Sequence, residues 1–264
     1  MESVSSCTEE QEAGYNPNIF LETYFSDKTV LNKHEIFWFP LHNLQQVFKP
    51  GFIKRKVLVS IGFGPVLYQL FSSCEFFEEV YIGTATELDV TECKKWLTKE
   101  PGCFDWTPAE REVCTSEGDL EKWAEKERRL RESVKQCLTF DFSQSNPFDP
   151  VVLPAADCLI LYFFLASSSR DGESFVDNLK KCVAQLKDGG NLVILGAMGM
   201  TYFTIGQHHF PCFSYNEQLL RETLDNVGCD IQVFNTIPRA DLTNTTYTDH
   251  KGFVCVVASK KGTA

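Results

Sequence analysis

The stretch whose residue types and spacing point most directly to chemistry is residues 60–65, SIGFGP, which carries Gly62 and Gly64. It follows an apolar run, and Pro65 can open a helix directly after the turn. A Gly-x-Gly turn between a strand and a helix lets the backbone approach a ligand closely and directs helix N-terminal amides towards it. A tight turn that packs a helix onto a strand needs glycine as well, and the third glycine of the dinucleotide-binding fingerprint is absent. Ligand binding and packing are therefore both open interpretations of this loop.

Two adjacent histidines, His208 and His209, are the other candidates for metal binding or base catalysis. Adjacent side chains on a strand point to opposite faces, and no acid or cysteine stands near them at ligand spacing. We therefore expect a surface loop there and predict neither a metal site nor a catalytic residue. The 11 cysteines contain no C-x-x-C pair. Their scatter through apolar runs indicates buried thiols in a reducing compartment.

The charge of the chain restricts its partners. Its 264 residues carry 36 Asp and Glu against 25 Lys and Arg, a formal net charge of −11. Such a chain repels phosphate backbones and anionic bilayers, so neither nucleic acid nor a membrane is an expected partner. The N-terminus lacks the basic and apolar regions of a signal peptide, and the apolar run at 158–166 is far shorter than the roughly 20 residues of a membrane helix. We predict a cytoplasmic protein in which residues 1–14 are disordered.

Hydrophobic periodicity predicts the elements that position the glycine loop. Apolar runs predict strands at 56–62, 79–84, 137–142, 158–165, 191–197, 231–237 and 252–259. Helical spacing predicts helices at 19–25, 33–48, 89–99, 120–134, 172–186 and 216–226, with Asp89 capping the third and a further helix opened by Pro65. This alternation predicts one domain over residues 1–264, built on a doubly wound α/β sheet. Ligands of such sheets bind beyond the carboxyl ends of the strands, here the loops after residues 60, 83, 141, 165 and 196.

Several motifs together resemble one protein family. The pattern Gly-x-Gly-Pro-x-x-Tyr-Gln at 62–69 is accompanied by Asn16-Pro17 and by an aromatic segment at 20–25. Further matching segments lie at 95–108, 141–145, 154–158, 186–190 and 202–206. These segments resemble the small-amine N-methyltransferase family, which comprises nicotinamide, phenylethanolamine and indolethylamine N-methyltransferases and thioether methyltransferase. The resemblance covers roughly residues 15–260 and is greatest to the nicotinamide enzyme.

This resemblance implies a class I S-adenosylmethionine-dependent methyltransferase fold, a Rossmann-like seven-stranded sheet with an N-terminal helical lid at 15–50. It implies S-adenosyl-L-methionine as cofactor, with the glycine loop at its methionine part, Tyr68 near its carboxylate, Asp141 along its adenine and the lid aromatics above it. The implied cofactor-binding residues are Phe20, Tyr24, Phe25, Gly62, Phe63, Gly64, Tyr68, Thr84, Asp89, Asp141 and Phe142. The implied substrate pocket contains Ala166, Gly196, Met200 and Tyr202. The alternatives are core or lid packing for the aromatic residues and a turn-capping role for Asp141.

The chain departs from the family pattern where carboxylates are expected. Ser60 stands where the family has the aspartate that ends the first strand, and Thr84 where it has the acid that binds the ribose. Ala166 and Gly196 stand where the nicotinamide enzyme carries aspartates. A carboxylate that accepts hydroxyl hydrogen bonds contributes about 1.5–3 kcal/mol. Loss of the ribose acid alone would therefore weaken cofactor binding about ten- to hundredfold.

Aromatic side chains replace polar ones around the same cleft. Phe20 stands where the family has a tyrosine, and Asp89 where it has an asparagine. The residues expected to line or neighbour the cleft are Phe63, Tyr162, Phe163, Phe164, Met198, Met200 and Phe203. Aromatic runs at strand ends are also typical of a protein core, so packing is again the alternative.

The residues support two functional hypotheses. The first is a methyltransferase-family protein with degenerate cofactor and substrate sites, weak or inactive in methyl transfer, that serves a binding, structural or regulatory role with an apolar ligand or a protein partner. It would bind S-adenosyl-L-methionine weakly, if at all. The alternative is an active cytosolic methyltransferase with rearranged contacts that acts on a small amine, pyridine or thioether. The identity of the small-molecule or protein partner and the oligomeric state stay open.

Overall fold

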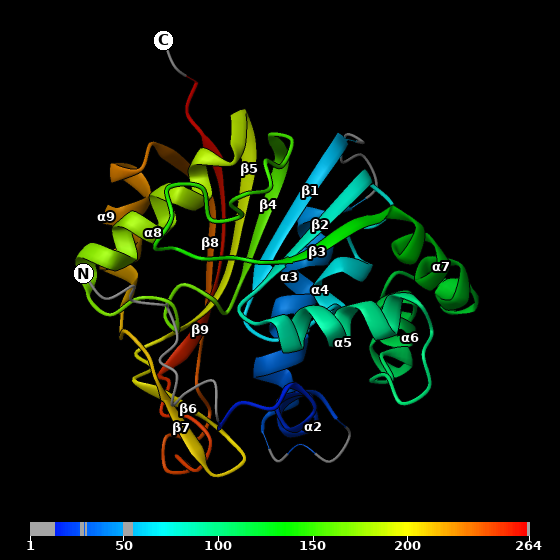
Figure 1. The fold of residues 1–264 in the computed structure, drawn as a ribbon. Helices are drawn as coiled ribbons and strands as arrows, with labels where there is room; N and C mark the ends of the chain where they lie inside the picture. Colours follow the sequence, from blue (N-terminus) through cyan, green and yellow to red (C-terminus); the bar gives the residue numbers. More distant parts are fainter. Residues whose placement is uncertain (1–13, 27–28, 30, 50–54, 263–264) are drawn as a thin grey trace.

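The structure is a computed structural model that describes residues 14–26, 29, 31–49 and 55–262. At its centre lies a sheet of seven strands (Figure 1). The strands are β1 (Arg55–Gly62), β2 (Phe77–Thr84), β3 (Val134–Thr139), β4 (Ala156–Tyr162), β5 (Leu186–Met198), β8 (Cys229–Pro238) and β9 (Gly252–Lys260). Of the N-terminal segment for which we predict disorder, residues 1–13 lie outside the described part of the chain.

The strand order in this sheet is β3-β2-β1-β4-β5-β9-β8. β1 to β5 are parallel, and β9 runs antiparallel to both β5 and β8. The order changes direction between β1 and β4, where Gly62 pairs with Tyr162. The carboxyl ends of these two strands therefore form the switch point at which ligands of open α/β sheets bind. Each strand overlaps one of the seven predicted apolar runs, which confirms the doubly wound α/β architecture.

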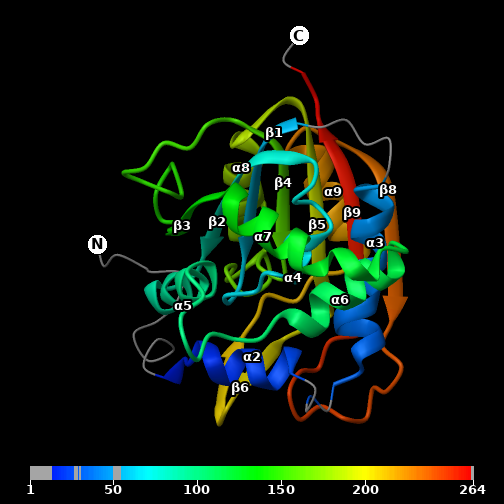
Figure 2. The ribbon, with the colours of Figure 1, turned by 90° about the vertical axis from the view of Figure 1, so that its right-hand side faces the viewer.

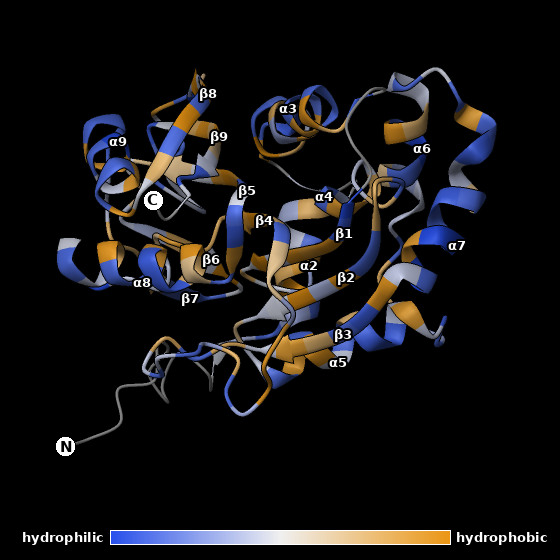
Figure 3. Ribbon diagram, turned by 90° about the horizontal axis from the view of Figure 1, so that it is seen from above, coloured by the Kyte–Doolittle hydropathy of each residue, from blue (hydrophilic) through white to orange (hydrophobic). Residues whose placement is uncertain are grey.

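Helices cover both faces of the sheet (Figure 3). One face carries α3 (Phe39–Val47), α4 (Tyr68–Phe71), α6 (Thr107–Ser116) and α7 (Trp123–Ser133), and the other carries α5 (Glu87–Leu97), α8 (Gly172–Ala184) and α9 (Glu217–Asn226). In α8, Asp171 and Ser174 form a capping box, and buried Phe175, Leu179 and Val183 recur at helical spacing. Covering both faces explains why the central strands are continuous apolar runs. Among the described residues, every helix falls short of the length or hydropathy that crossing a bilayer requires.

One helix and a hairpin lie beyond the carboxyl ends of the central strands (Figures 1 and 2). They are α2 (Pro17–Phe25), which belongs to the predicted lid, and the neighbouring hairpin of β6 (Tyr202–Ile205) and β7 (His208–Pro211). The Asn16 side chain caps α2 by accepting hydrogen bonds from the backbone amides of Asn18 and Ile19. The helix predicted at 33–48 is divided into a π-helix, His34–Trp38, and α3.

Several helix and strand ends differ from the predictions, and at two of them a local hydrogen bond gives the reason. α5 begins at Glu87, because Thr86 rather than Asp89 is its cap: the Thr86 hydroxyl accepts a hydrogen bond from the Asp89 amide, and the Thr86 amide donates to the Asp89 carboxylate. β3 ends at Thr139, ahead of the predicted 142, because Asp141 turns the chain by accepting a hydrogen bond from the Ser143 amide. Both differences arise from local side-chain to backbone hydrogen bonds.

One predicted helix begins later than expected, and one segment has another type of structure. The short α4 begins only at Tyr68, since Gly64 has a φ of +75° and the Val66 carbonyl accepts the side-chain amide of Gln69. His208 and His209 belong to strand β7 rather than to a surface loop, and β7 pairs with β6. Both histidines are exposed there. This segment is a strand because it pairs with β6, and its own composition gives no sign of that pairing.

Candidate functional site

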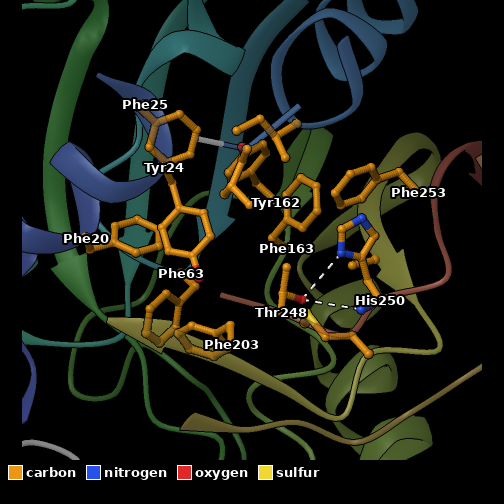
Figure 4. Close-up of a pocket in the computed structure, with 14 residues that line it drawn as sticks. Phe20, Tyr24, Phe25, Phe63, Tyr162, Phe163, Phe203, Thr248, His250 and Phe253 are labelled. Atoms are coloured by element: carbon orange, nitrogen blue, oxygen red, sulfur yellow. Dashed lines mark hydrogen bonds between the residues drawn. The ribbon is translucent and has the colours of Figure 1, made fainter. Parts of the chain in front are cut away.

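A cavity of about 80 Å³ lies beside the carboxyl ends of β1 and β4. Figure 4 shows aromatic rings that converge on it from α2, from the loops after both strands and from the segment that enters β9. The cavity is lined by Phe20, Tyr24, Phe25, Leu31, Ile36, Phe63, Tyr162, Phe163, Ala197, Met200, Phe203, Thr248, His250 and Phe253. It thus brings together the three aromatic residues predicted for the lid and five of the seven predicted for the cleft. None of these described lining residues carries a carboxylate.

The ring of Phe20 packs directly on the glycine loop. A Cβ atom on Gly64 would lie 2.2 Å from Cε1 of Phe20, and the φ of Gly64 is +75°. The rings of Phe20 and Phe63 meet edge to face with their centroids 5.5 Å apart. Glycine is therefore required at position 64 both by the backbone conformation and by the ring above it. The space that the family resemblance assigns to the methionine part of a cofactor holds Phe20.

Tyr68 is fully buried and its hydroxyl is engaged within the protein. It donates a hydrogen bond to the Ile36 carbonyl over 3.1 Å and accepts one from the Tyr162 hydroxyl over 3.0 Å. Burial raises the pKa of Tyr68 well above its ordinary value. The phenol therefore stays protonated, and its hydrogen bond to the Ile36 carbonyl links α4 to the π-helix.

The end of β2, where the resemblance expects the ribose acid, is closed by neutral groups. Thr84 is buried, and its hydroxyl donates to the Thr86 carbonyl over 3.3 Å. The neighbouring Gly83 faces Phe148, whose Cε1 would lie 2.9 Å from a Cβ added to the glycine. The end of β2 therefore presents a hydroxyl and an aromatic ring rather than a carboxylate.

Asp89 provides a carboxylate nearby, and the protein itself binds it. It is completely buried and accepts hydrogen bonds from the Tyr15 hydroxyl and from the Thr86 amide. Burial raises the pKa of Asp89 to about 7, and the hydrogen bonds from Tyr15 and Thr86 offset only part of this increase. The ring of Tyr15 in turn packs edge to face on Phe63. Tyr15 thus joins the buried acid to the aromatic cluster.

Asp141 and Phe142 occupy the loop after β3. The Asp141 carboxylate accepts the backbone amide of Ser143 over 2.8 Å and its hydroxyl over 2.7 Å. Partial burial pushes the pKa of Asp141 upward, but these hydrogen bonds outweigh it and hold the pKa below its ordinary value. Phe142 stacks on Phe164 with a centroid separation of 5.0 Å. The geometry matches the turn-capping alternative for Asp141 and the packing alternative for Phe142.

The predicted substrate residues are divided between different surroundings. Met200 lines the aromatic cavity, whereas Ala166 and Gly196 border a hollow of about 10 Å³ next to Tyr215. A Cβ atom on Gly196 would lie 2.2 Å from the Tyr215 hydroxyl oxygen, so this hydroxyl fills the place of an aspartate side chain. Tyr202 donates its hydroxyl to the Thr245 carbonyl over 2.5 Å instead of lining the cavity.

Several contributors to the site carry no signal in their own sequence segments. Thr248, His250 and Phe253 reach the cavity from near the C-terminus, more than 200 residues from α2. The His250 imidazole lies 3.6 Å from the Glu35 carboxylate, and burial lowers the pKa of His250 to about 4. The histidine is therefore neutral at pH 7. Phe163 has a φ of +46°, a left-handed conformation that is strained for a bulky side chain.

We expect the protein to become more stable as the pH falls from 8.5 to about 6.5. Burial raises the pKa of Asp89 to about 7, and burial with the nearby Glu127 raises that of Glu110 to about 8. Both values exceed the pKa of about 4 that a carboxyl has in the unfolded chain. As the pH falls, the folded chain therefore binds these protons before the unfolded chain does. The stability that these groups contribute is lost as the pH rises through 7–8. His250 acts in the opposite sense, because its imidazole binds protons around pH 6.5 only in the unfolded chain, so it offsets a small part of the gain at the lower end of this interval.

Thermal midpoints from circular dichroism at pH 6.5 and 8.5 measure this effect. Glu110→Gln should reduce the difference between the two midpoints, because it removes one of the two titrating groups. A midpoint that is constant or rises with pH over this interval would show that the two carboxyls are ionised in the folded chain.

Comparison with known proteins supports the sequence resemblance. Residues 4–261 match the model of the NNMT/PNMT/TEMT family. The chain is 33% identical to nicotinamide N-methyltransferase of Homo sapiens over 266 residues, which cover 98% of each chain. It is 31% identical to indolethylamine N-methyltransferase of Mus musculus over 255 residues, 96% of each chain. Phenylethanolamine N-methyltransferase of Homo sapiens is 33% identical over 225 residues, which cover 84% of this chain and 79% of that enzyme.

Solved structures agree with the fold. Magnesium protoporphyrin IX methyltransferase from Synechocystis, determined with bound S-adenosylmethionine, superposes with a TM-score of 0.55 at 12% identity. The superposition covers 92% of this chain and 90% of that enzyme. At this identity the likeness concerns the fold alone, a class I S-adenosylmethionine-dependent methyltransferase fold. Since the family model matches nearly the whole length and three curated methyltransferases are at least 31% identical, the chain belongs to the NNMT/PNMT/TEMT family.

Proposed function

We propose that this chain is a methyltransferase-family protein whose cofactor and substrate sites are degenerate, so that it transfers methyl groups weakly or not at all and serves a binding, structural or regulatory role. The observation that carries this proposal is the Phe20 ring on the glycine loop, with Cε1 2.2 Å from the place of a Cβ on Gly64. A ligand that approached the backbone of this loop would have to displace the ring and with it the start of α2.

The partners of the polar groups support the same conclusion. The buried Tyr68 hydroxyl donates to the Ile36 carbonyl, and the buried Asp89 carboxylate accepts from Tyr15 and Thr86. A cofactor that took the place of these partners would have to displace them, and each buried group left unpaired costs about 1–3 kcal/mol. The residues present therefore do not fit S-adenosyl-L-methionine as they are arranged, and we derive no reaction step through it.

The aromatic cavity favours a small, neutral and apolar ligand for the binding role. Its volume of about 80 Å³ is well below the roughly 300–1,000 Å³ of typical ligand pockets. Its lining offers aromatic faces, Met200 and a neutral His250 but no carboxylate. An ammonium group enclosed there would lose its hydration without gaining a paired anion, which is unfavourable. A cytoplasmic location remains part of this proposal, supported by the ten described cysteines, all of which are free thiols.

Transfer of a radiolabelled methyl group to a panel of pyridines, indolethylamines and thioethers tests the proposal. Human nicotinamide N-methyltransferase is the positive control, and heat-denatured protein gives the background. We expect no product above this background. Turnover of any substrate in the panel at a rate near that of the control enzyme would contradict the proposal.

The alternative is an active cytosolic methyltransferase for a small amine, pyridine or thioether. It is favoured by the family match over nearly the whole chain and by the retained glycine turn, in which Gly64 keeps a φ of +75°. It requires Phe20 and α2 to move away from this turn when the cofactor binds. The same assay separates the two proposals, because only the alternative yields methylated product at a rate near that of the control enzyme.

A further inference from the structure

A second hollow, a cleft of about 540 Å³, lies on the other side of the α2 aromatic residues. We call it the outer cleft. Its walls are the second half of α2, the π-helix, the connection between α5 and α6 and the start of α6, which lie together in Figure 2. Neither Gly62, Phe63 nor Gly64 lines it, whereas Tyr24, Phe25 and Ile36 border both hollows. The outer cleft is therefore separated from the glycine loop by the lid itself.

Aromatic rings form a continuous surface around the outer cleft. Phe104 and Trp106 have centroids 4.7 Å apart, and Trp106 lies 5.7 Å from Phe25. On the opposite wall, Phe37 and Trp38 are 5.6 Å apart. Tyr68 lies behind the cleft and joins the two walls, with its ring 5.8 Å from Phe25 and 4.9 Å from Phe37. Phe25, Phe37, Trp38, Phe104 and Trp106 thus contribute their rings to the wall of one hollow.

The charged residues of the outer cleft are mainly acidic. Among the described residues that line it are the three carboxylates of Glu22, Asp105 and Glu112, against one ammonium, Lys33. The side chains of Glu22 and Glu112 make no hydrogen bond or ion pair with any described residue. Asp105 accepts the backbone amide of Thr107 over 2.9 Å. Acidic side chains alone would not define a site, but here they stand at the rim of an aromatic hollow of ligand size.

We propose that the outer cleft binds a small organic cation, of the quaternary or methylated ammonium class. Ring faces attract a cation through their quadrupole, and quaternary ammonium ions favour aromatic cages because they are weakly hydrated. The carboxylates at the rim add attraction, while the open side leaves the cation partly hydrated. The cavity at the glycine loop also has aromatic rings but has no carboxylate among its described lining residues. The outer cleft shares Tyr24 and Phe25 with the aromatic cavity but lacks the glycine loop, and the proposal does not depend on whether methyl transfer occurs.

Titration of the full-length protein with choline, followed by tryptophan fluorescence and by ligand-observed NMR, tests this proposal. The comparison ligand is 3,3-dimethyl-1-butanol, which has the shape of choline but no charge. We expect saturable choline binding with a dissociation constant in the millimolar range or tighter, and binding of the neutral isostere at least about fivefold weaker. Raising the salt concentration to 0.5 M should weaken the binding of choline only. Equal binding of the two ligands would overturn the proposal.

Three variants locate the site. Trp38→Leu should weaken choline binding about fivefold, the effect of one ring face on a partly exposed cation. Glu112→Gln should weaken it about two- to fivefold, as expected for one exposed charge pair. Glu121→Gln, an exposed carboxylate outside the outer cleft, should leave it unchanged. If Trp38→Leu does not fold, the two Glu→Gln variants decide the matter. If Glu112→Gln and Glu121→Gln change choline binding to the same extent, the proposal is overturned.

Discussion

Replacement of Phe20 by alanine is expected to lower the stability of the protein and, at the same time, to raise its affinity for S-adenosyl-L-methionine. Phe20 is only 7% exposed and packs against Phe63, Tyr24 and Phe25. Removing such a ring costs about 3–5 kcal/mol in free energy of unfolding. The same change vacates the space over Gly64. If displacing the ring costs about 1.4 kcal/mol in the wild type, its removal increases affinity about tenfold.

Urea unfolding and calorimetric titration of the same preparation measure the two effects. Phe77→Ala is the matched control, because Phe77 is 5% exposed and lies at the start of β2, at the opposite end of the strand from the site. It should reduce stability without any gain in affinity. An equal change of affinity in both variants, or a loss in Phe20→Ala, would mean that the ring does not block the glycine loop.

Restoring a carboxylate at the end of β2 is the second change with a large expected effect. In the Phe20→Ala background, Thr84→Asp should raise cofactor affinity by a further ten- to hundredfold, about 1.5–3 kcal/mol for a carboxylate that accepts hydroxyl hydrogen bonds. Thr84 is buried close to Asp89, so the new acid should also lower stability through desolvation and like-charge repulsion.

Thr84→Asn in the same background separates charge from shape. It has the size of aspartate and one acceptor oxygen but no charge, so it should recover only a small part of the gain. Titration calorimetry of the three proteins gives the comparison. If the asparagine variant binds as tightly as the aspartate variant, the missing carboxylate is not what limits cofactor binding.

The architecture was largely predictable because its central strands are buried on both faces. A strand such as β1 is apolar along its length, and its apolar run at 56–62 identifies it without knowledge of its neighbours. The β6–β7 hairpin was missed because its two strands are only four residues long and include threonine and histidine. Each of them is a strand because it pairs with the other. Strand and helix ends were displaced where a single side chain, Thr86 or Asp141, bonds the backbone.

The site was predictable in part of its membership but not in its internal contacts, because the aromatic cavity includes the predicted aromatic residues of α2 but not Tyr68, Thr84 or Asp141. The motif at 62–69 and the aromatic segment at 20–25 indicated which residues meet, and Phe20, Tyr24 and Phe25 do lie around one cavity with Phe63. That Tyr15 binds Asp89, 74 residues away, or that Tyr215 fills the place beside Gly196, depends on tertiary packing alone. The roles of these residues towards a cofactor stay predictions.

The central claim is that the glycine loop and the acids around it no longer hold the methyl donor. Calorimetric titration of the unmodified protein with S-adenosyl-L-methionine tests this most directly, with human nicotinamide N-methyltransferase titrated under the same conditions as the positive control. The account predicts a dissociation constant weaker than about 100 μM or no saturable heat at all. A dissociation constant in the low micromolar range would contradict it.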